Sequence, residues 1–320
     1  MIVVSVRCLA YFILGRLHRD KSGEEVKVKI GLLAVDGNGK FPNLPLMKIS
    51  AYHKNRGDDV VWAIPWERYD RLYMSKIFTF TPDDLHYYDA GETVRGGTGY
   101  RPDGRLPDEI EHIYPDYSLY PQFPEAYGFL TRGCPRNCKF CIVSQKEGKC
   151  SRQVAELGEF WRGQKTIKLL DPNLLACADR EKILHTLTDS RAWVDFTQGL
   201  DIRLTDQHIA GMLRNIKTKK LNFAWDNPNE DLSGHFAMVK RITELDERGI
   251  RAYVLTNFNS SHEQDLYRIY KLREIGVDPF IMVYNKETAP KITKQLQRWV
   301  NNKYIWHSCE RFEEYDPKSG

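Results

Sequence analysis

The chain lacks an apolar run long enough to cross a membrane. Its first apolar segment, residues 2–15, is shorter than the roughly 20 residues that a transmembrane helix needs, and Arg7 interrupts it. The segment also lacks the leading positive charge and the small-residue cleavage site of a secretory signal. We therefore expect a cytoplasmic protein without a membrane partner, and we treat residues 1–27 as an N-terminal extension without an assigned role.

Cysteine is scarce and unevenly placed. The 320 residues contain seven cysteines, and three of them, Cys134, Cys138 and Cys141, lie in one short stretch. An odd, sparse and clustered set does not fit a disulfide framework, and it is typical of a reducing cytosol. A second C-x2-C or Cys/His pair, which zinc modules usually carry, is also missing.

A strong net charge is absent as well, because the formal charge at pH 7 is only +4. That excess does not by itself indicate a nucleic-acid partner. It is concentrated between residues 131 and 152, where six basic residues accompany one acid, Glu147. We interpret this local charge as compensation for an anionic, thiolate-bound centre, with an anionic substrate as the alternative.

The cysteine triplet is the most informative feature that is present. Cys134, Cys138 and Cys141 have the spacing C-x3-C-x2-C, which lets three thiolates from one loop converge on a soft metal centre. Three ligands would leave one iron of a cubane iron–sulfur cluster open to another molecule. An open iron implies chemistry in addition to electron storage.

This spacing, with Phe140 directly before the last cysteine and an apolar strand at 126–130 before the first, resembles the signature of radical S-adenosylmethionine enzymes. The resemblance implies that the thiolates hold a [4Fe-4S] cluster and that S-adenosylmethionine chelates its fourth iron. The cluster would then donate an electron, and the sulfonium would break into methionine and a 5'-deoxyadenosyl radical. It also implies an electron donor such as flavodoxin or ferredoxin.

Cys150 offers an alternative from another class of protein. It could join the triplet in a closed four-cysteine zinc site, which would make the chain a non-catalytic metal-binding protein. Otherwise Cys150 and Cys309 are each a hydrogen donor, an auxiliary ligand or, most simply, a small buried thiol.

Residues 28–120 show strands and helices in the order typical of a small doubly wound α/β domain of Rossmann-like or flavodoxin-like type. We expect strands at 28–35, 59–63 and 70–81, the end of a fourth at 92–97, and a helix from 46 to 56. The order resembles the cobalamin-binding-type domain that precedes many radical S-adenosylmethionine cores. The loop at 36–40 has no histidine, so ligation by an axial histidine is not expected, and cobalamin stays an open candidate.

A stretch rich in proline, aspartate and tyrosine, residues 99–123, is interpreted as a linker, and the glycine cluster at 96–99 as a tight turn. The following residues, 121–288, alternate strand and helix six times and are expected to form a partial (β/α)6 barrel, with residues 289–320 as a C-terminal helix and tail. The expected strands cover 126–131, 166–170, 192–197, 221–225, 251–256 and 279–284. The expected helices cover 154–161, 180–190, 206–215, 234–248, 262–275 and 289–301.

Ligands of barrel-like sheets bind at the carboxyl ends of the strands, where polar residues recur in this sequence. Asp171 and Asn173 follow the second core strand, where the family often contacts the methionine amino group. Gln198, Asp201 and Arg203 follow the third, where the family often contacts the ribose or the methionine carboxylate. The resemblance therefore implies a cofactor site that contains these five residues and Phe140.

Polar residues also follow the later strands, among them Asp226, Asn227 and Asn257. Asp and Asn at strand ends also cap helices and form turns, so each of these residues has that simpler interpretation as well. The second substrate, a small molecule, RNA or another macromolecule, is not identified by the sequence. The sequence also does not identify the reaction on this substrate, which is either hydrogen abstraction or transfer of a methyl or methylthio group. The C-terminal tail carries no recognisable RNA-binding module.

Overall fold

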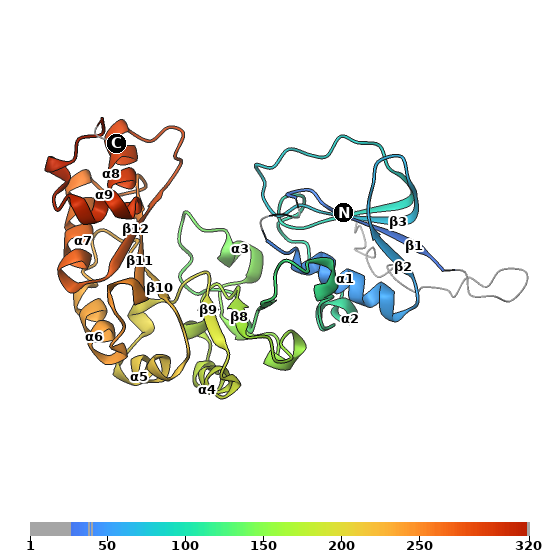
Figure 1. The fold of residues 1–320 in the computed structure, drawn as a ribbon, viewed down its shortest axis with the longest axis horizontal. Coiled ribbons are helices and arrows are strands. Elements are labelled where there is room, and N and C mark those ends of the chain that lie inside the picture. The colour runs from blue at the N-terminus through green and yellow to red at the C-terminus, as the bar shows by residue number, and fades with distance from the viewer. Residues whose placement is uncertain (1–26, 38, 40, 319–320) are drawn as a thin grey trace, which may run out of the picture. The chain divides into compact units, whose positions relative to one another are not determined.

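The computed structural model describes residues 27–37, 39 and 41–318, so the predicted N-terminal extension lies outside the described residues except for its last position. The chain divides into two compact units, one that ends at Ile110 and one that spans Glu111–Gly320. Figure 1 shows the strands and helices of each unit.

The first unit is built on a four-stranded parallel sheet in the order β2-β1-β3-β4. The strands are β1 (Lys29–Ala34), β2 (Asp59–Trp62), β3 (Arg68–Ser75) and β4 (Asp89–Gly96). Helix α1 (Leu44–Asn55) joins β1 to β2 and begins at Asn43, whose side chain accepts the Leu46 N–H. The short helix α2 (Asp108–Glu111) follows β4.

Two connections of this unit differ from the doubly wound prediction, in which helices cover both faces of the sheet. Among the described residues, neither the segment 63–67 between β2 and β3 nor the segment 76–88 between β3 and β4 contains a helix. Pro82, followed by Asp83 and Asp84, favours turns over a helix in the longer connection. The strand predicted at 70–81 accordingly ends at Ser75.

The glycine turn after β4 packs tightly against Lys76. A Cβ atom at Gly97 would lie 2.3 Å from the Lys76 carbonyl oxygen, and one at Gly99 would lie 2.5 Å from the Lys76 side chain. Gly97 also has a φ of 90°, which L side chains rarely adopt. The prediction of a tight turn is confirmed, and close packing explains the glycines at positions 97 and 99, whereas a Cβ at Gly96 would meet nothing within 4 Å.

The second unit contains six parallel strands in two three-stranded sheets, β5-β8-β9 and β10-β11-β12. A single bridge between Leu200 and Phe223 joins the two sheets, so the six strands follow one another in chain order. The mixed α/β class with parallel sheets is confirmed, and closure into a partial barrel stays a prediction. The strands are β5 (Ala126–Gly128), β8 (Thr166–Leu169), β9 (Trp193–Phe196), β10 (Leu221–Ala224), β11 (Ile250–Thr256) and β12 (Asp278–Val283).

Helices follow these strands and, in Figure 1, α4 to α7 lie along the outer side of the strands. None of the described helices combines the length and the apolar character that crossing a bilayer requires. The main helices are α4 (Arg180–Ser190), α5 (Gln207–Asn215), α6 (Ser233–Thr243), α7 (His262–Ile275) and α8 (Lys291–Asn301), and the shorter α9 (Lys303–Ser308) follows.

Two helix predictions in this unit need correction. The helix predicted at 154–161 is wrong, because the segment contains only a 3-10 turn, Leu157–Glu159, whose neighbour Phe160 packs over Gly128. A Cβ at Gly128 would lie 2.3 Å from the Phe160 ring, so this contact requires glycine. The helix predicted to reach residue 248 ends at Thr243, and its C-cap residue, Glu244, has a left-handed φ of 54°.

Side chains cap the outer edges of the two sheets. On β12, the Asn301 side chain accepts the Ile281 N–H at 2.8 Å and donates to the Ile281 carbonyl at 3.1 Å. On β5, the Tyr117 hydroxyl accepts the Tyr127 N–H at 3.0 Å and donates to the Phe160 carbonyl at 2.7 Å. The contacts to Ile281 and to the Tyr127 N–H occupy backbone groups that another strand would otherwise pair with.

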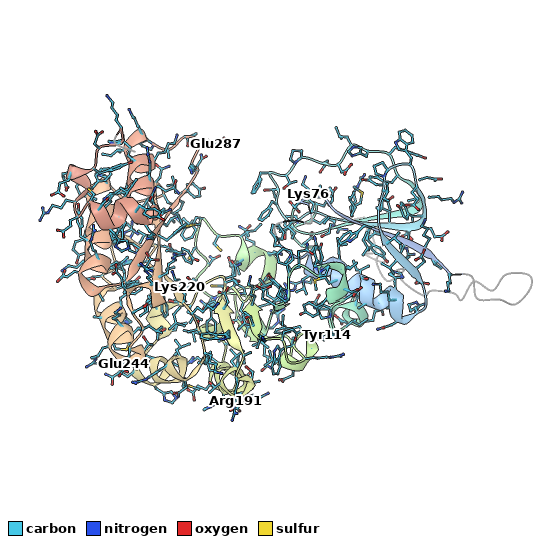
Figure 2. All side chains as sticks on the ribbon, in the orientation of Figure 1. Lys76, Tyr114, Arg191, Lys220, Glu244 and Glu287 are labelled. Atoms are coloured by element: carbon cyan, nitrogen blue, oxygen red, sulfur yellow. The ribbon has the colours of Figure 1, made fainter. Side chains whose placement is uncertain are left out.

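An ion cluster lies at the amino ends of β10, β11 and β12. The carboxylate of Asp278 accepts two hydrogen bonds from Arg251, at 3.0 and 2.8 Å, and pairs with Lys303 and with Lys220, which Figure 2 labels. Burial alone would raise the pKa of Asp278, but the hydrogen bonds and charges of Lys303 and Arg251 lower it below the usual range. Burial lowers the pKa of Lys303, and the charges of Arg251 and Lys220 lower it further. In barrel-like folds this end of the strands serves stability.

Candidate functional site

The cysteine loop leaves the short strand β6 (Thr131–Arg132), which pairs antiparallel with β7 (Arg152–Gln153). Gly133 begins the loop with a φ of 93°, and a Cβ there would lie 2.1 Å from the Cys150 carbonyl oxygen. The Cys134 N–H donates to the Gly148 carbonyl at 3.1 Å. The base of the loop is therefore closed by backbone contacts that require glycine at position 133.

Cys134, Cys138 and Cys141 are free and half-buried, and the Cys141 N–H donates to the Cys138 carbonyl at 3.0 Å. Burial raises the pKa of the Cys138 thiol, and Asp226 and the other two thiols raise it further, whereas Arg203 opposes them. Cys138 is therefore within electrostatic reach of both other thiols.

Within the part of the chain that the structure describes, no three His, Cys, Asp or Glu side chains are arranged to hold a single metal ion. A mononuclear zinc site needs all its sulfur ligands about 2.3 Å from one atom, whereas a cubane cluster offers each thiolate its own iron. Cys150, the fourth ligand of the zinc alternative, is exposed, and its thiol donates to the Ser151 carbonyl at 3.6 Å.

Asp171, the first carboxylate after β8, is 5% exposed and binds the chain just before the loop. One oxygen accepts the N–H and the hydroxyl of Thr131, at 2.5 and 2.7 Å, and the other accepts the Leu130 N–H at 3.2 Å. Burial raises the pKa of Asp171 to about 6 against the effect of these donors. Its observed contacts position the strand that leads into the cysteine loop, and contact with a cofactor stays a prediction.

Asn173 lies directly against the cysteine loop. Its Nδ2 donates to Cys134 Sγ at 3.5 Å and to Asp201 Oδ2 at 3.4 Å, and its backbone carbonyl accepts the Ser151 hydroxyl at 2.9 Å. The side chain is almost fully buried, yet its Oδ1 has no hydrogen-bond partner within the described residues. A buried acceptor without a donor is costly, so this oxygen indicates a place for a ligand that can donate.

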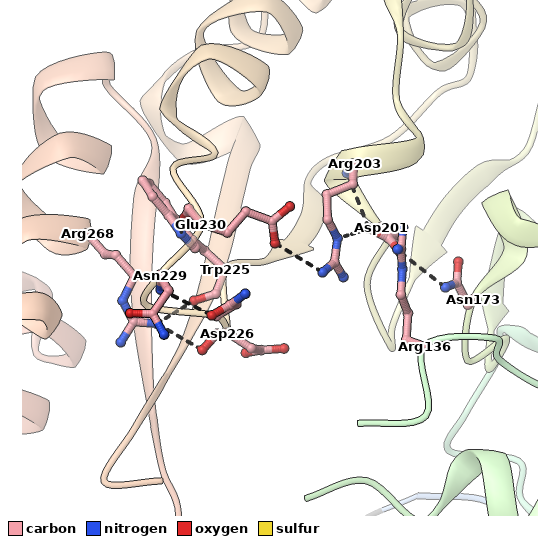
Figure 3. A network of polar contacts seen from close by, with 10 residues as sticks. Arg136, Asn173, Asp201, Arg203, Trp225, Asp226, Asn229, Glu230 and Arg268 are labelled. Carbon is pink, nitrogen blue, oxygen red and sulfur yellow. Dashed lines mark hydrogen bonds and ion pairs between the residues drawn. The ribbon is translucent and has the colours of Figure 1, made fainter. Parts of the chain in front are cut away.

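Asp201 connects the end of the β9 segment to the cysteine loop. Its Oδ2 accepts from Arg136 Nε at 2.5 Å, and its Oδ1 accepts the N–H and Nε of Arg203, at 3.2 and 2.8 Å. Figure 3 shows the carboxylate between the two guanidinium groups, with Glu230 on the far side of Arg203 at 3.5 Å. Burial would raise the pKa of Asp201, but the two arginines lower it overall.

Phe140 and Gln198, the remaining predicted cofactor contacts, lie in different surroundings. The Phe140 ring packs edge-on against Phe258 at 5.3 Å, and Phe258 packs in the same way against Tyr284 at 5.0 Å, so the cysteine loop meets the ends of β11 and β12. Gln198 is exposed in the turn after β9, and no described hydrogen bond brings it to Asn173, Asp201 or their partners.

Two residues at the rim were not among the predicted cofactor contacts. Asp226 follows β10, and burial raises its pKa although the charges of Arg268 and Arg203 oppose the shift. In Figure 3 its carboxylate points away from Arg268. Arg268 is fully buried and donates to the carbonyls of Trp225 and Leu255, at 2.7 and 3.0 Å. Asp226 follows the rule of polar residues at strand ends, but nothing in the pattern of α7 singles out Arg268.

Comparison with known proteins gives a similarity of fold alone. No protein-family model matches the chain, and no curated protein matches it. A solved structure of the radical S-adenosylmethionine methyltransferase TsrM from Kitasatospora setae, with cobalamin and a [4Fe-4S] cluster bound, is similar with a TM-score of 0.61 and 11% sequence identity. The similar region covers 81% of this chain and 75% of that one.

Proposed function

We propose that this chain is a radical S-adenosylmethionine enzyme that holds a [4Fe-4S] cluster through Cys134, Cys138 and Cys141. When bound, the cluster and S-adenosylmethionine supply the one-electron chemistry that starts the reaction. The fold similarity to TsrM and the three half-buried free thiols of one loop support this proposal. The observation that carries it is the unpartnered, buried Oδ1 of Asn173, next to the Cys134 thiol.

Asn173 Oδ1 is suited to accept a hydrogen bond from the amino group of S-adenosylmethionine. The same side chain donates from Nδ2 to Cys134 and Asp201, which fixes its orientation and leaves Oδ1 for the ligand. An amide held in this way recognises a donor without any rearrangement, so little conformational entropy is lost when the ligand binds.

Asp226 is the carboxylate that remains for hydroxyl groups of the ligand. Protein donors already occupy both oxygens of Asp171 and both oxygens of Asp201. The Leu255 N–H donates a hydrogen bond to the Asp226 carboxylate, but no described side chain forms an ion pair with it. Asp226 is half-buried at the end of β10 and within electrostatic reach of Cys138. The Phe140 ring, anchored on Phe258, supplies an apolar wall next to the thiols.

Cobalamin belongs to the proposal as a second candidate cofactor, for the first unit. TsrM binds cobalamin, and the segments after β1 and β3 of this chain carry three clustered aromatic rings, Phe41, Phe78 and Phe80. Phe80 is 80% exposed and stacks on Phe78 at 5.0 Å. An apolar platform at the carboxyl edge of a parallel sheet suits a large planar ligand. Retention of cobalamin absorbance through gel filtration tests this assignment.

The remaining parts of the proposal concern partners and compartment. Reductive cleavage needs one electron per turnover, so a flavodoxin- or ferredoxin-type donor is proposed, in the cytoplasm. The second substrate is proposed to be a small molecule, RNA or another macromolecule, which either loses a hydrogen atom or receives a methyl or methylthio group.

Anaerobic reconstitution with iron and sulfide tests the enzyme proposal. We expect a brown protein with about four irons that forms 5'-deoxyadenosine from S-adenosylmethionine and dithionite, measured by liquid chromatography and mass spectrometry. Cys138→Ala is expected to abolish both properties, whereas Cys309→Ala, a half-buried thiol outside the loop, is expected to keep them. Asn173→Ala should keep the cluster and weaken S-adenosylmethionine binding at least about tenfold. A colourless, zinc-loaded protein that forms no 5'-deoxyadenosine would contradict the proposal.

A further inference from the structure

Asp201 balances the charges that lie beside the cysteine loop. Within the described part of residues 131–152, the base Arg132 pairs with the buried acid Glu147 at 3.3 Å. Arg136, between Cys134 and Cys138, instead pairs with Asp201, which lies 65 residues further along the chain. Asp201 therefore compensates a loop cation that the loop's own acid does not pair with.

The same carboxylate also compensates Arg203. The guanidinium of Arg203 donates to Asp201 at 2.8 Å and interacts electrostatically with the Cys138 thiol. Its other acidic partner, Glu230, lies 3.5 Å away and is more exposed than Asp201, with side-chain exposures of 36% and 5%. Loss of the Asp201 charge would leave two cations next to the thiols, with only a more solvated acid to oppose them.

Asp201 also fixes a hydrogen bond to sulfur. Asn173 Nδ2 lies 3.4 Å from Asp201 Oδ2 and 3.5 Å from Cys134 Sγ, so the carboxylate helps to orient the amide towards the thiol. The reduction potential of an iron–sulfur cluster depends on nearby charge and on hydrogen bonds to its sulfur atoms. Asp201 affects both the charge near the thiols and the hydrogen bond to Cys134.

We propose that Asp201 is a positioning residue that sets the reduction potential of the cluster held by the cysteine loop, because it balances Arg136 and Arg203 and orients Asn173. This role rests on the proposed function. It assigns Asp201 to the support of the cluster, and it leaves Asn173 Oδ1 and Asp226 as the groups that face the ligand.

Spectroelectrochemistry of the reconstituted full-length protein, followed by electron paramagnetic resonance, tests the role through the sign of the shift. Asp201→Asn is expected to move the midpoint potential to a more positive value, because added positive charge favours the reduced cluster. Arg136→Gln and Arg203→Gln are expected to move it to more negative values. The double variant Asp201→Asn/Arg136→Gln should return towards the wild-type value. Asp189→Asn, an exposed acid on α4, is the matched control and should cause no shift.

The outcomes separate this role from the proposed function. A wild-type protein that takes up no iron and sulfide overturns the proposed function and this role with it. A wild-type cluster whose potential is unmoved by Asp201→Asn, or moved in the same direction by the acid and base variants, overturns the role alone. If Asp201→Asn retains no cluster, the two arginine variants decide, and Asp201→Glu, which keeps the charge, should restore cluster retention.

Discussion

Replacement of Arg268 by methionine is expected to destabilise the second unit strongly. Arg268 is fully buried in α7, and its guanidinium pairs with Asp265 at 2.5 Å and donates to the carbonyls of Trp225 and Leu255. Burial lowers the pKa of Arg268 and raises that of Asp265, each against the attraction of the partner. The contact between the two charged groups therefore compensates the cost of burying them, and removal of either group leaves the other at that cost.

The magnitude follows from what methionine would leave behind. Removal of one partner of a buried ion pair costs about 3–5 kcal/mol, because the other charge stays buried without compensation. The carbonyls at the ends of β10 and β11 would also lose a charged donor, each worth about 1.5–3 kcal/mol, although these losses overlap with the first. We expect a decrease of about 4 kcal/mol in the free energy of unfolding. For a domain of this size, that decrease in the free energy of unfolding corresponds to a fall of roughly 8–16 °C in melting temperature.

Urea unfolding followed by circular dichroism measures this change. Lys271→Met in the same helix is the matched control. The ion pair that Lys271 forms with Glu274 is exposed, so this substitution should change the stability by less than about 0.5 kcal/mol. The double variant Arg268→Met/Asp265→Leu should recover part of the loss, since it removes the stranded charge. A loss below about 1 kcal/mol for Arg268→Met would refute the reasoning.

Two further predictions concern the ends of the strands and the cysteine loop. Asp278→Asn should lower the free energy of unfolding by ~3 kcal/mol at neutral pH, because it strands Arg251, Lys220 and Lys303. The folded-state pKa of Asp278 is lowered, so its contribution to the free energy of unfolding is complete above the unfolded pKa of about 3.9 and disappears as the pH falls through the folded value. Chemical unfolding between pH 6 and pH 3 should therefore show that the variant loses less stability on acidification than the wild type. Equal pH profiles for the two proteins would contradict this. Gly133→Ala should reduce iron retention after reconstitution, because its Cβ would lie 2.1 Å from the Cys150 carbonyl oxygen. The control Gly163→Ala has a similar φ of 95° and open space around it, so it should lower the free energy of unfolding by only about 1 kcal/mol and keep the iron. Equal iron contents in the two variants would count against the packing argument.

The six parallel strands of the second unit could be predicted from the sequence because buried parallel strands appear as apolar runs, whereas the short antiparallel pair β6 and β7 was not predicted. Helix α7 matched its predicted bounds, His262–Ile275, since Ser261 and Gln264 form a capping box and Gly276 ends the helix in a left-handed conformation. The segment 154–161 has apolar residues at helical spacing but uses them to pack Phe160 over Gly128. That contact joins distant parts of the chain and leaves no periodic signal.

The sequence predicts carboxylates directly after the strands, but it does not predict their contacts. Carboxylates after strands were expected at the rim, and Asp171 and Asp201 lie there. Their oxygens, however, are occupied by Thr131 and by Arg136, which lie 40 and 65 residues away in sequence. Whether a strand-end carboxylate binds a ligand or supports a loop depends on such distant partners, which a single sequence does not reveal.

The position of the ion cluster around Asp278 has a consequence for the evolution of this fold. It lies at the amino ends of the strands whose carboxyl ends carry Asp226, Asn257 and Tyr284. Substitutions at the carboxyl ends, where the proposed site lies, leave the salt bridges at the opposite ends undisturbed. If the proposed function holds, selection for a new substrate and selection for folding act on separate sets of residues, a division that favours evolutionary diversification of the site.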